Sequence, residues 1–265
     1  MAGTVRVCDR EFAQRSRSAI HPRVAEALSD LPRGRLLDLP AGSGALAYRL
    51  HRDGFAVTAC DIHPEQFEPA EIPCVRGDLG GRLPFEDASF DAAAFIEGPE
   101  HAEDPAHALR EFARVLKPGG RLVLSLPNYG NIEKRLKMLF FGSFEKGVSQ
   151  ERLREDFGGD PAMLHLVPLV WAQLKFFLES AGFRVERLLK DRAKPRQRLL
   201  WPLALLVRLV SRLRSPRDRD RYWLDEVNSG TILMGGNTLI VVARREGKGG
   251  AGRAAAPGPT PGGEE

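Results

Sequence analysis

The chain has 265 residues, of which 43% are hydrophobic and 28% charged, a composition typical of a globular domain with an ordinary core. Its three cysteines show no CxxC spacing, which argues against a disulfide framework and a zinc site, so we expect no metal. No run reaches the roughly 20 apolar residues of a membrane-spanning helix, and no signal-peptide core is visible. We therefore expect a cytoplasmic protein; peripheral contact with the inner face of the membrane stays open.

Strand-like and helix-like stretches alternate along the chain, which predicts a parallel sheet flanked by helices. Asp104 is placed as the N-cap of one helix, with a proline at the first helical position. The expected elements are a helix at 23–31, a strand at 35–39, a helix at 45–52, strands at 55–60, 73–77 and 90–96, a helix at 105–116, a strand at 121–126, a helix at 170–181, and strands at 184–189 and 237–243.

Two segments, about 127–166 and 192–235, are not needed to complete the sheet. We expect both to be insertions that recognise a substrate. One domain over 1–245 is predicted, followed by a disordered tail at 246–265, because the Gly, Ala and Pro residues of the tail bury little apolar surface.

Positive charge is concentrated in one segment. Residues 184–221 hold 13 Lys or Arg against 4 Asp or Glu, although the whole chain has a formal net charge of only +4. Such a segment favours an anionic partner, which could be phospholipid, a phosphorylated substrate or nucleic acid. A solvated basic surface without a partner is the alternative.

Within this basic segment, residues 199–214 have the pattern of an amphipathic helix that begins near Pro202. Arg208 and Arg212 point away from its apolar stripe. This composition suits a helix that lies in a bilayer interface. A helix whose stripe packs on the protein's own core or on a partner subunit is the alternative. The stripe consists of Leu203, Leu206, Val207, Val210 and Leu213.

A glycine-rich turn, Asp38-Leu-Pro-Ala-Gly-Ser-Gly44, lies between the first predicted strand and a helix. Gly42 and Gly44 allow backbone angles and close ligand approach that a Cβ would prevent. Asp61, at the end of the next strand, could accept hydrogen bonds from both ribose hydroxyls of an adenosine. These features fit NAD and S-adenosylmethionine equally, and a tight turn without any ligand also stays open.

Three later runs favour one of these cofactors: Gly77-Asp78-Leu79, then Leu83-Pro84-Phe85 with Asp87-Ala-Ser-Phe-Asp91, then Lys117-Pro-Gly-Gly120. Together with the glycine turn, they resemble the class I S-adenosylmethionine-dependent methyltransferases. The resemblance implies a Rossmann-like, seven-stranded, mostly parallel sheet with helices on both faces and an antiparallel last strand. It also implies S-adenosylmethionine as the cofactor and methyl transfer as the activity.

The resemblance assigns Asp78 to the adenine amino group and the Leu79 N–H to a ring nitrogen. The chain departs from the family at Pro40 and Ala41, where a glycine and a cysteine are common. We expect a stiffer turn that still binds the cofactor. The complete set of implied cofactor contacts is Asp38, Pro40, Ala41, Gly42, Gly44, Asp61, Ile62, Asp78, Leu79 and Glu97.

Ser125-Leu-Pro-Asn-Tyr-Gly-Asn131 and the region after it resemble methyltransferases encoded beside bacterial glycosyltransferases. This implies a bacterial enzyme that methylates a small molecule, a glycan or a lipid-linked acceptor, with oxygen as the expected atom. A hydroxyl acceptor benefits from a general base. The candidate bases are Glu97, Glu100 and His101, with Tyr129 and His165 as further candidates from the insertion.

Two other functions stay open. The spacing of Gly42, Gly44 and Ala47 also fits an NAD-dependent oxidoreductase. A non-catalytic module with a methyltransferase fold could tether to membrane or nucleic acid through residues 184–221. Nucleic acid is the less expected partner, because no Asn-Pro-Pro-Tyr-like motif for base flipping is present. The oligomeric state is left open.

Overall fold

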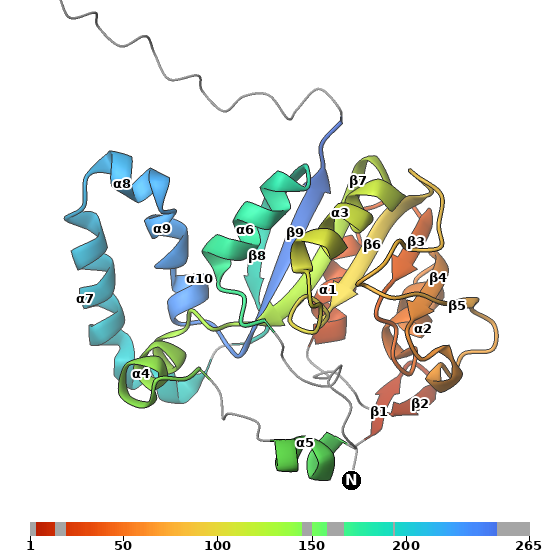
Figure 1. The fold of residues 1–265 in the computed structure, drawn as a ribbon, viewed down its shortest axis with the longest axis horizontal. Helices are drawn as coiled ribbons and strands as arrows, with labels where there is room; N and C mark the ends of the chain where they lie inside the picture. Colours follow the sequence, from red (N-terminus) through yellow and green to blue (C-terminus); the bar gives the residue numbers. More distant parts are fainter. Residues whose placement is uncertain (1–3, 14–19, 145–149, 158–166, 193, 248–265) are drawn as a thin grey trace, which may run out of the picture.

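The computed structural model describes residues 4–13, 20–144, 150–157, 167–192 and 194–247 (Figure 1). Its centre is a seven-stranded sheet in the order β5-β4-β3-β6-β7-β9-β8. β9 runs antiparallel to both of its neighbours, and the other pairs are parallel, as expected. The strands are β3 (Arg35–Asp38), β4 (Ala56–Asp61), β5 (Cys74–Arg76), β6 (Phe90–Ile96), β7 (Leu116–Pro127), β8 (Phe183–Lys190) and β9 (Thr238–Arg245).

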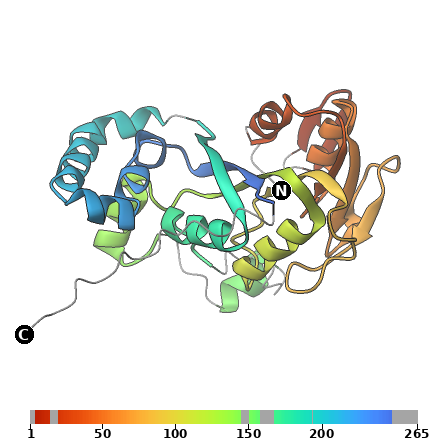
Figure 2. The same ribbon diagram turned by 90° about the horizontal axis from the view of Figure 1, so that it is seen from above.

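The helices cover both faces of the sheet, which explains why the central strands are nearly continuous apolar runs (Figure 2). One core lies under α1 (Ile20–Leu28) and α2 (Ala45–Arg52), and the other lies under α3 (Pro105–Val115) and α6 (Trp171–Ser180). The Asp104 side chain caps α3 by accepting from the His107 N–H at 2.9 Å, as the sequence predicts.

β7 begins earlier than predicted. The Lys-Pro-Gly-Gly run ends α3 at Val115, but the strand already starts at Leu116. Phe90 pairs with Leu116, and Ala92, only two residues further on, pairs with Arg121. The extra residues of β7 are accommodated by this irregularity, which the sequence pattern does not reveal.

A short N-terminal hairpin is absent from the sequence prediction. It consists of β1 (Thr4–Val7) and β2 (Arg10–Ala13), which pair with each other and not with the main sheet. Phe12 is buried with its ring 5.3 Å from that of Tyr48, whose hydroxyl donates to Asp9 at 2.8 Å. Four-residue strands with charged residues between apolar ones give too weak a pattern to be recognised without this packing.

The insertions form helices beyond the β8 edge of the sheet and below it (Figures 1 and 2). The first contributes α4 (Ile132–Phe141) and α5 (Gln150–Phe157). The second contributes the 3₁₀ segment η3 (Pro195–Leu200), α7 (Trp201–Arg212), α8 (Pro216–Arg221), α9 (Leu224–Val227) and α10 (Gly230–Leu233). Among the described residues, no helix is both long and apolar enough to span a bilayer.

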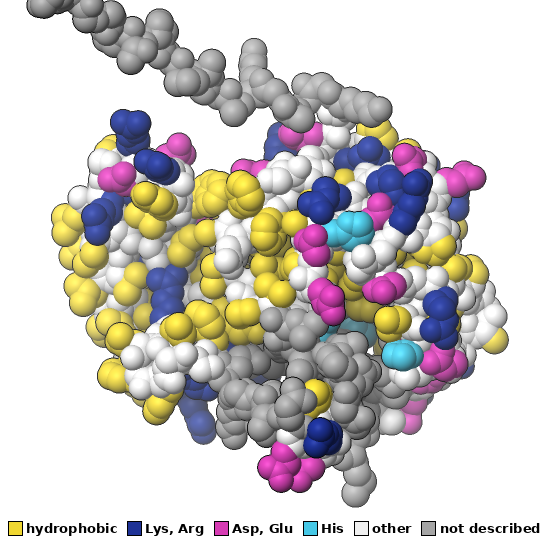
Figure 3. All heavy atoms as spheres, in the orientation of Figure 1, with side chains coloured by type: hydrophobic (Ala, Val, Ile, Leu, Met, Phe, Trp, Pro, Cys, Tyr) yellow, Lys and Arg dark blue, Asp and Glu magenta, His cyan; other side chains and the backbone are white. Residues whose placement is uncertain are grey.

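The predicted amphipathic helix exists as α7, but its apolar stripe does not pack on the protein's own core. The buried residues are the small Ala204 and Ser211, while Leu206 and Leu213 are 53% and 80% exposed. The alternative of internal packing is therefore wrong for most of the stripe. Small side chains let α7 lie close to its neighbours and direct the large ones outward, so apolar atoms gather over this part of the surface (Figure 3).

Candidate cofactor and active site

The glycine turn lies between the carboxyl ends of β4 and β6. The Leu39 N–H donates to the Ala94 carbonyl at 3.0 Å, and the Ala41 N–H donates to the Cys60 carbonyl at 3.0 Å. Because β3, β4 and β6 are parallel, their carboxyl ends share one edge of the sheet. The turn therefore stands where ligands of such sheets bind.

Gly44, the residue before α2, must be glycine for two reasons. Its φ of 89° lies in the left-handed region. A Cβ there would also lie only 2.5 Å from Pro69 Cδ and 2.6 Å from the Phe67 ring. Phe67 and Pro69 thus form a wall against the turn that the motif analysis missed, because nothing in the sequence brings residues 67–69 to this position.

Asp61 is buried at the end of β4 and anchors the turn. Its Oδ2 accepts from the Gly42 N–H at 2.8 Å and its Oδ1 accepts from the His63 N–H at 2.9 Å. Each carboxylate oxygen has two acceptor sites, so both retain capacity for a ligand hydroxyl. The structure thus places Asp61 where the sequence expects it.

Asp38 is the most perturbed acid of the site. Its side chain is 1% exposed, and neither carboxylate oxygen accepts a hydrogen bond of ordinary geometry from a described residue. Burial, reinforced by the nearby Asp61 charge and partly offset by the Ala47 amide, raises the pKa of Asp38 to about 8. A buried acid facing a second acid fits a site for a cationic ligand group, and S-adenosylmethionine carries an ammonium.

The other predicted cofactor contacts surround this edge. The Gly77 N–H donates to the Asp61 carbonyl at 3.0 Å, which holds the segment after β5 beside the end of β4. Asp78 is exposed, and its Oδ1 accepts from the Gly80 N–H at 2.8 Å. Leu79 packs partly on the core, while Ile62 is 41% exposed.

Glu97 follows β6 and adopts a left-handed φ of 48°, which is uncommon for a residue with a side chain. Its N–H donates to the Ser125 carbonyl at 3.1 Å and to Ser125 Oγ at 3.0 Å. A Cβ at the neighbouring Gly98 would lie 2.8 Å from Pro40 Cδ, so this segment touches the glycine turn. Strained backbone is often found at functional sites. The sequence places Ser125 in a recognised run but does not predict this contact with Glu97.

The remaining base candidates fall into three groups. Glu100 and His101 follow Glu97 after two residues; Glu100 is buried, and the His101 N–H donates to the Gly98 carbonyl at 3.0 Å. Tyr129 is buried with its ring 5.3 Å from that of Phe144, so it packs within its own insertion. His165 lies outside the described residues.

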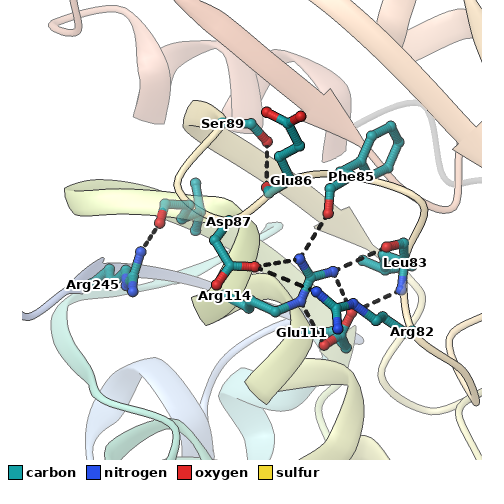
Figure 4. Close-up of polar contacts among 10 residues, drawn as sticks. Arg82, Leu83, Phe85, Glu86, Asp87, Ser89, Glu111, Arg114 and Arg245 are labelled. Carbon is teal, nitrogen blue, oxygen red and sulfur yellow. Dashed lines mark hydrogen bonds and ion pairs between the residues drawn. The ribbon is translucent and has the colours of Figure 1, made fainter.

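The Leu83–Asp91 run has a structural role (Figure 4). Arg114 on α3 donates to the Leu83 and Phe85 carbonyls at 3.0 and 2.7 Å and pairs with Asp87 and Glu111 at 2.8 and 2.7 Å. Glu111 in turn accepts from the Leu83 N–H at 2.7 Å. The two carboxylates raise the pKa of Arg114, and Arg114 lowers those of Asp87 and Glu111. This part of the motif holds a loop in place.

Comparison with known proteins agrees with the resemblance read from the sequence. Residues 37–124 match the family model described as "Methyltransferase domain". A demethylmenaquinone methyltransferase of Corynebacterium efficiens is 35% identical over 136 residues, which cover 48% of this chain and 59% of that protein. A demethylmenaquinone methyltransferase of Corynebacterium kroppenstedtii is 40% identical over 100 residues, 37% of this chain and 43% of that protein. The chain thus spans about half the length of these curated relatives.

Two solved structures show the same fold. A methyltransferase from Archaeoglobus fulgidus described as SAM-dependent aligns with a TM-score of 0.56 at 18% identity, over 87% of this chain and 95% of that one. An S-adenosylmethionine-dependent methyltransferase from Mesorhizobium loti aligns with a TM-score of 0.53 at 20% identity, over 86% and 98%. Residues 37–124 are thus identified as a methyltransferase domain, and the sheet around them has the fold of these S-adenosylmethionine-dependent methyltransferases.

Proposed function

We propose that this chain transfers the methyl group of S-adenosylmethionine to an oxygen atom of a small-molecule, glycan or lipid-linked acceptor. The observation that carries the proposal is the buried Asp38 beside Asp61 and the glycine turn. The relatives named demethylmenaquinone methyltransferase support a small-molecule acceptor. A lipid-linked acceptor is reached from a membrane surface, so the proposal includes peripheral membrane contact through residues 199–214.

In this proposal, each part of the site holds a different part of the cofactor. Asp38 faces the ammonium, with the main chain of Pro40 and Ala41 beside it. Gly42 and Gly44 let the methionine end approach the main chain. Glu97 lies on the side of the cofactor site that faces the end of β6. At the adenosine end, Asp61 accepts from the ribose hydroxyls, Ile62 offers an apolar surface to the adenine, and Asp78 with the Leu79 N–H reads the adenine edge.

The bound cofactor supplies a methyl carbon already activated by the positive sulfonium. The protein therefore acts mainly by positioning, which can account for roughly 7–11 kcal/mol of barrier lowering. A hydroxyl acceptor gains about a factor of 10²–10⁴ from a base. Glu97, Glu100 and His101 are the proposed source of that base, because they follow β6 directly and their segment touches the glycine turn.

The proposal is tested with the full chain and labelled S-adenosylmethionine. The protein is incubated with lipid, glycan and small-molecule fractions of a bacterial host, and the label is followed. We expect one of these three fractions to take up label, which identifies the class of acceptor. In parallel, calorimetry should show binding of S-adenosylhomocysteine and none of NAD. Binding of NAD alone would contradict the proposal, and absence of binding to either would favour the non-catalytic module.

The base assignment is tested separately with His101→Ala. Because His101 is proposed to move a proton and not to hold the cofactor, turnover should fall about 10²–10⁴-fold while S-adenosylhomocysteine affinity stays nearly constant. Steady-state kinetics on the identified acceptor and calorimetry on the same preparation provide the two values. His51→Ala serves as the control, because His51 is exposed in the last turn of α2, at the opposite end of that helix from the glycine turn. Equal losses of turnover and affinity in His101→Ala would remove His101 from the mechanism.

A further inference from the structure

α7 exposes its apolar side chains across a broad face. Leu205, Leu206, Leu209 and Val210 are each about half exposed, and Leu213 is 80% exposed. At 100° per residue these positions all fall on the half of the helix opposite the buried Ala204 and Ser211. A soluble helix normally turns such residues inward, so this face is built to contact an apolar partner.

Two arginines lie along one edge of that face. Arg208 and Arg212 follow each other at one helical turn, between the buried side and the apolar side of α7. Both are exposed, and neither forms a hydrogen bond or ion pair with another residue in the described part of the chain. Their charges are available to an anion.

These arginines line a pocket between α7 and the segment that carries α8 and α9. The pocket has a volume of about 170 Å³, which is enough for a phosphate group. We call it the arginine pocket; its polar lining is Arg208, Arg212, Arg219, Ser211, Asp225 and Asn228.

The charge of the arginine pocket is not neutralised from within. Arg219 is held by Asp225, at 2.6 Å between Nη2 and Oδ2, which accounts for the pocket's one acid. Beneath the pocket, Asn228 donates to Ser211 Oγ at 2.6 Å and accepts from Arg135 Nη1 at 2.7 Å. Among the described residues, Arg135 donates to the carbonyl oxygens of Asn228, Val227 and Gly130 and to no carboxylate, so it adds a further positive charge.

A second apolar group lies at the same end of the molecule. The last turn of α4 exposes Met138, Leu139, Phe140 and Phe141. α4 is joined to the segment before α7 by the ion pair of Lys194 with Glu133 at 2.6 Å, and both views place these helices together (Figures 1 and 2). Figure 3 shows apolar side chains spread over this region with Lys and Arg among them.

We propose that the arginine pocket binds the phosphate of an anionic phospholipid headgroup while the apolar face of α7 enters the interface of the same leaflet. The adjacency of free guanidinium groups and exposed apolar side chains on one helix selects a lipid surface, because an anionic membrane offers phosphate and hydrocarbon side by side. Membrane binding itself does not depend on the proposed function. Only its role, which is to bring the active site to a lipid-linked acceptor, rests on that proposal.

The test is flotation of the full chain with vesicles of phosphatidylcholine alone or mixed with phosphatidylglycerol. Wild-type protein should float with the mixed vesicles and much less with phosphatidylcholine. Arg208→Gln with Arg212→Gln should weaken partition to the mixed vesicles about 30-fold, because each arginine near an anionic surface contributes about 1 kcal/mol. Arg6→Gln with Arg52→Gln is the matched control, since it removes two exposed arginines from the N-terminal hairpin and α2. The control should float like wild type.

A second variant tests the apolar face. Leu205→Ser with Leu209→Ser should abolish flotation with both kinds of vesicle while circular dichroism and S-adenosylhomocysteine affinity stay unchanged, because both side chains are exposed. If the arginine variant and its control lost partition to the mixed vesicles equally, the assignment of the arginine pocket as a phosphate site would be wrong. Wild-type protein that stays off vesicles but dimerises in sedimentation, and becomes monomeric in the leucine variant, would assign the face to a second copy. Flotation without cofactor binding would leave the docking intact and refute the proposed function.

Discussion

Binding of S-adenosylhomocysteine at pH 7 is expected to release up to about one proton per molecule of protein. Burial and the Asp61 charge raise the pKa of Asp38 to about 8, so this carboxyl is mostly protonated in the free protein at pH 7. An ammonium placed against it favours the carboxylate and expels the proton. Calorimetry in two buffers of different ionisation enthalpy measures the release. Asp38→Asn should abolish it and weaken affinity about 10–100-fold, the effect of one hydrogen bond to a charged group.

The same carboxyl fixes the sign of a pH effect on stability. An acid whose pKa is raised in the folded state binds more protons folded than unfolded, so stability falls as pH rises. For Asp38 the fall should extend from about pH 4 to about pH 8 in cofactor-free protein. Urea denaturation across this range should show a flatter profile for Asp38→Asn than for wild type. Asp53→Asn, an exposed acid after α2, should leave both measurements unchanged. Proton release that persists in Asp38→Asn would assign it to another group.

Arg114→Ala is expected to lower the free energy of unfolding by about 3–5 kcal/mol. The Arg114 and Glu111 side chains are only 16% and 12% exposed, so the substitution leaves a carboxylate largely buried without its cation. It also removes the donors to the Leu83 and Phe85 carbonyls, which hold the loop before β6 (Figure 4). Urea denaturation followed by circular dichroism measures the change.

Arg110→Ala on the same helix is the matched control. Arg110 pairs with Asp104 at 3.5 Å, and both side chains are 58% exposed, so its loss should cost only about 0–1 kcal/mol. The double variant Glu111→Gln with Arg114→Met should be less destabilised than Arg114→Ala, because no buried charge is left unpaired. If Arg114→Ala unfolded at the same urea concentration as Arg110→Ala, the contacts of Arg114 would contribute little to the free energy of unfolding.

Local sequence signals were sufficient to predict the bounds of some helices and strands. The predicted bounds of α2 and β6 agree with the structure, because the glycine turn marks the start of α2 and a continuous apolar run marks β6. The hairpin β1–β2 and the early start of β7 were missed, since the hairpin packs through Phe12 on the distant Tyr48 and the start of β7 depends on pairing with β6. The same limit applies to the site: Phe67, Pro69 and Ser125 reach the glycine turn and Glu97 only through the fold.

The sequence by itself predicted the methyltransferase domain and the topology of the sheet, because the glycine turn and the later runs around Asp78 and Lys117 resemble that family as a set. Tertiary structure decided the protonation of Asp38, which depends on complete burial beside a second acid. It also decided the direction of α7. Helical periodicity groups apolar residues on one side, but only the packing of Ala204 and Ser211 against the rest of the insertion shows that this side faces outward.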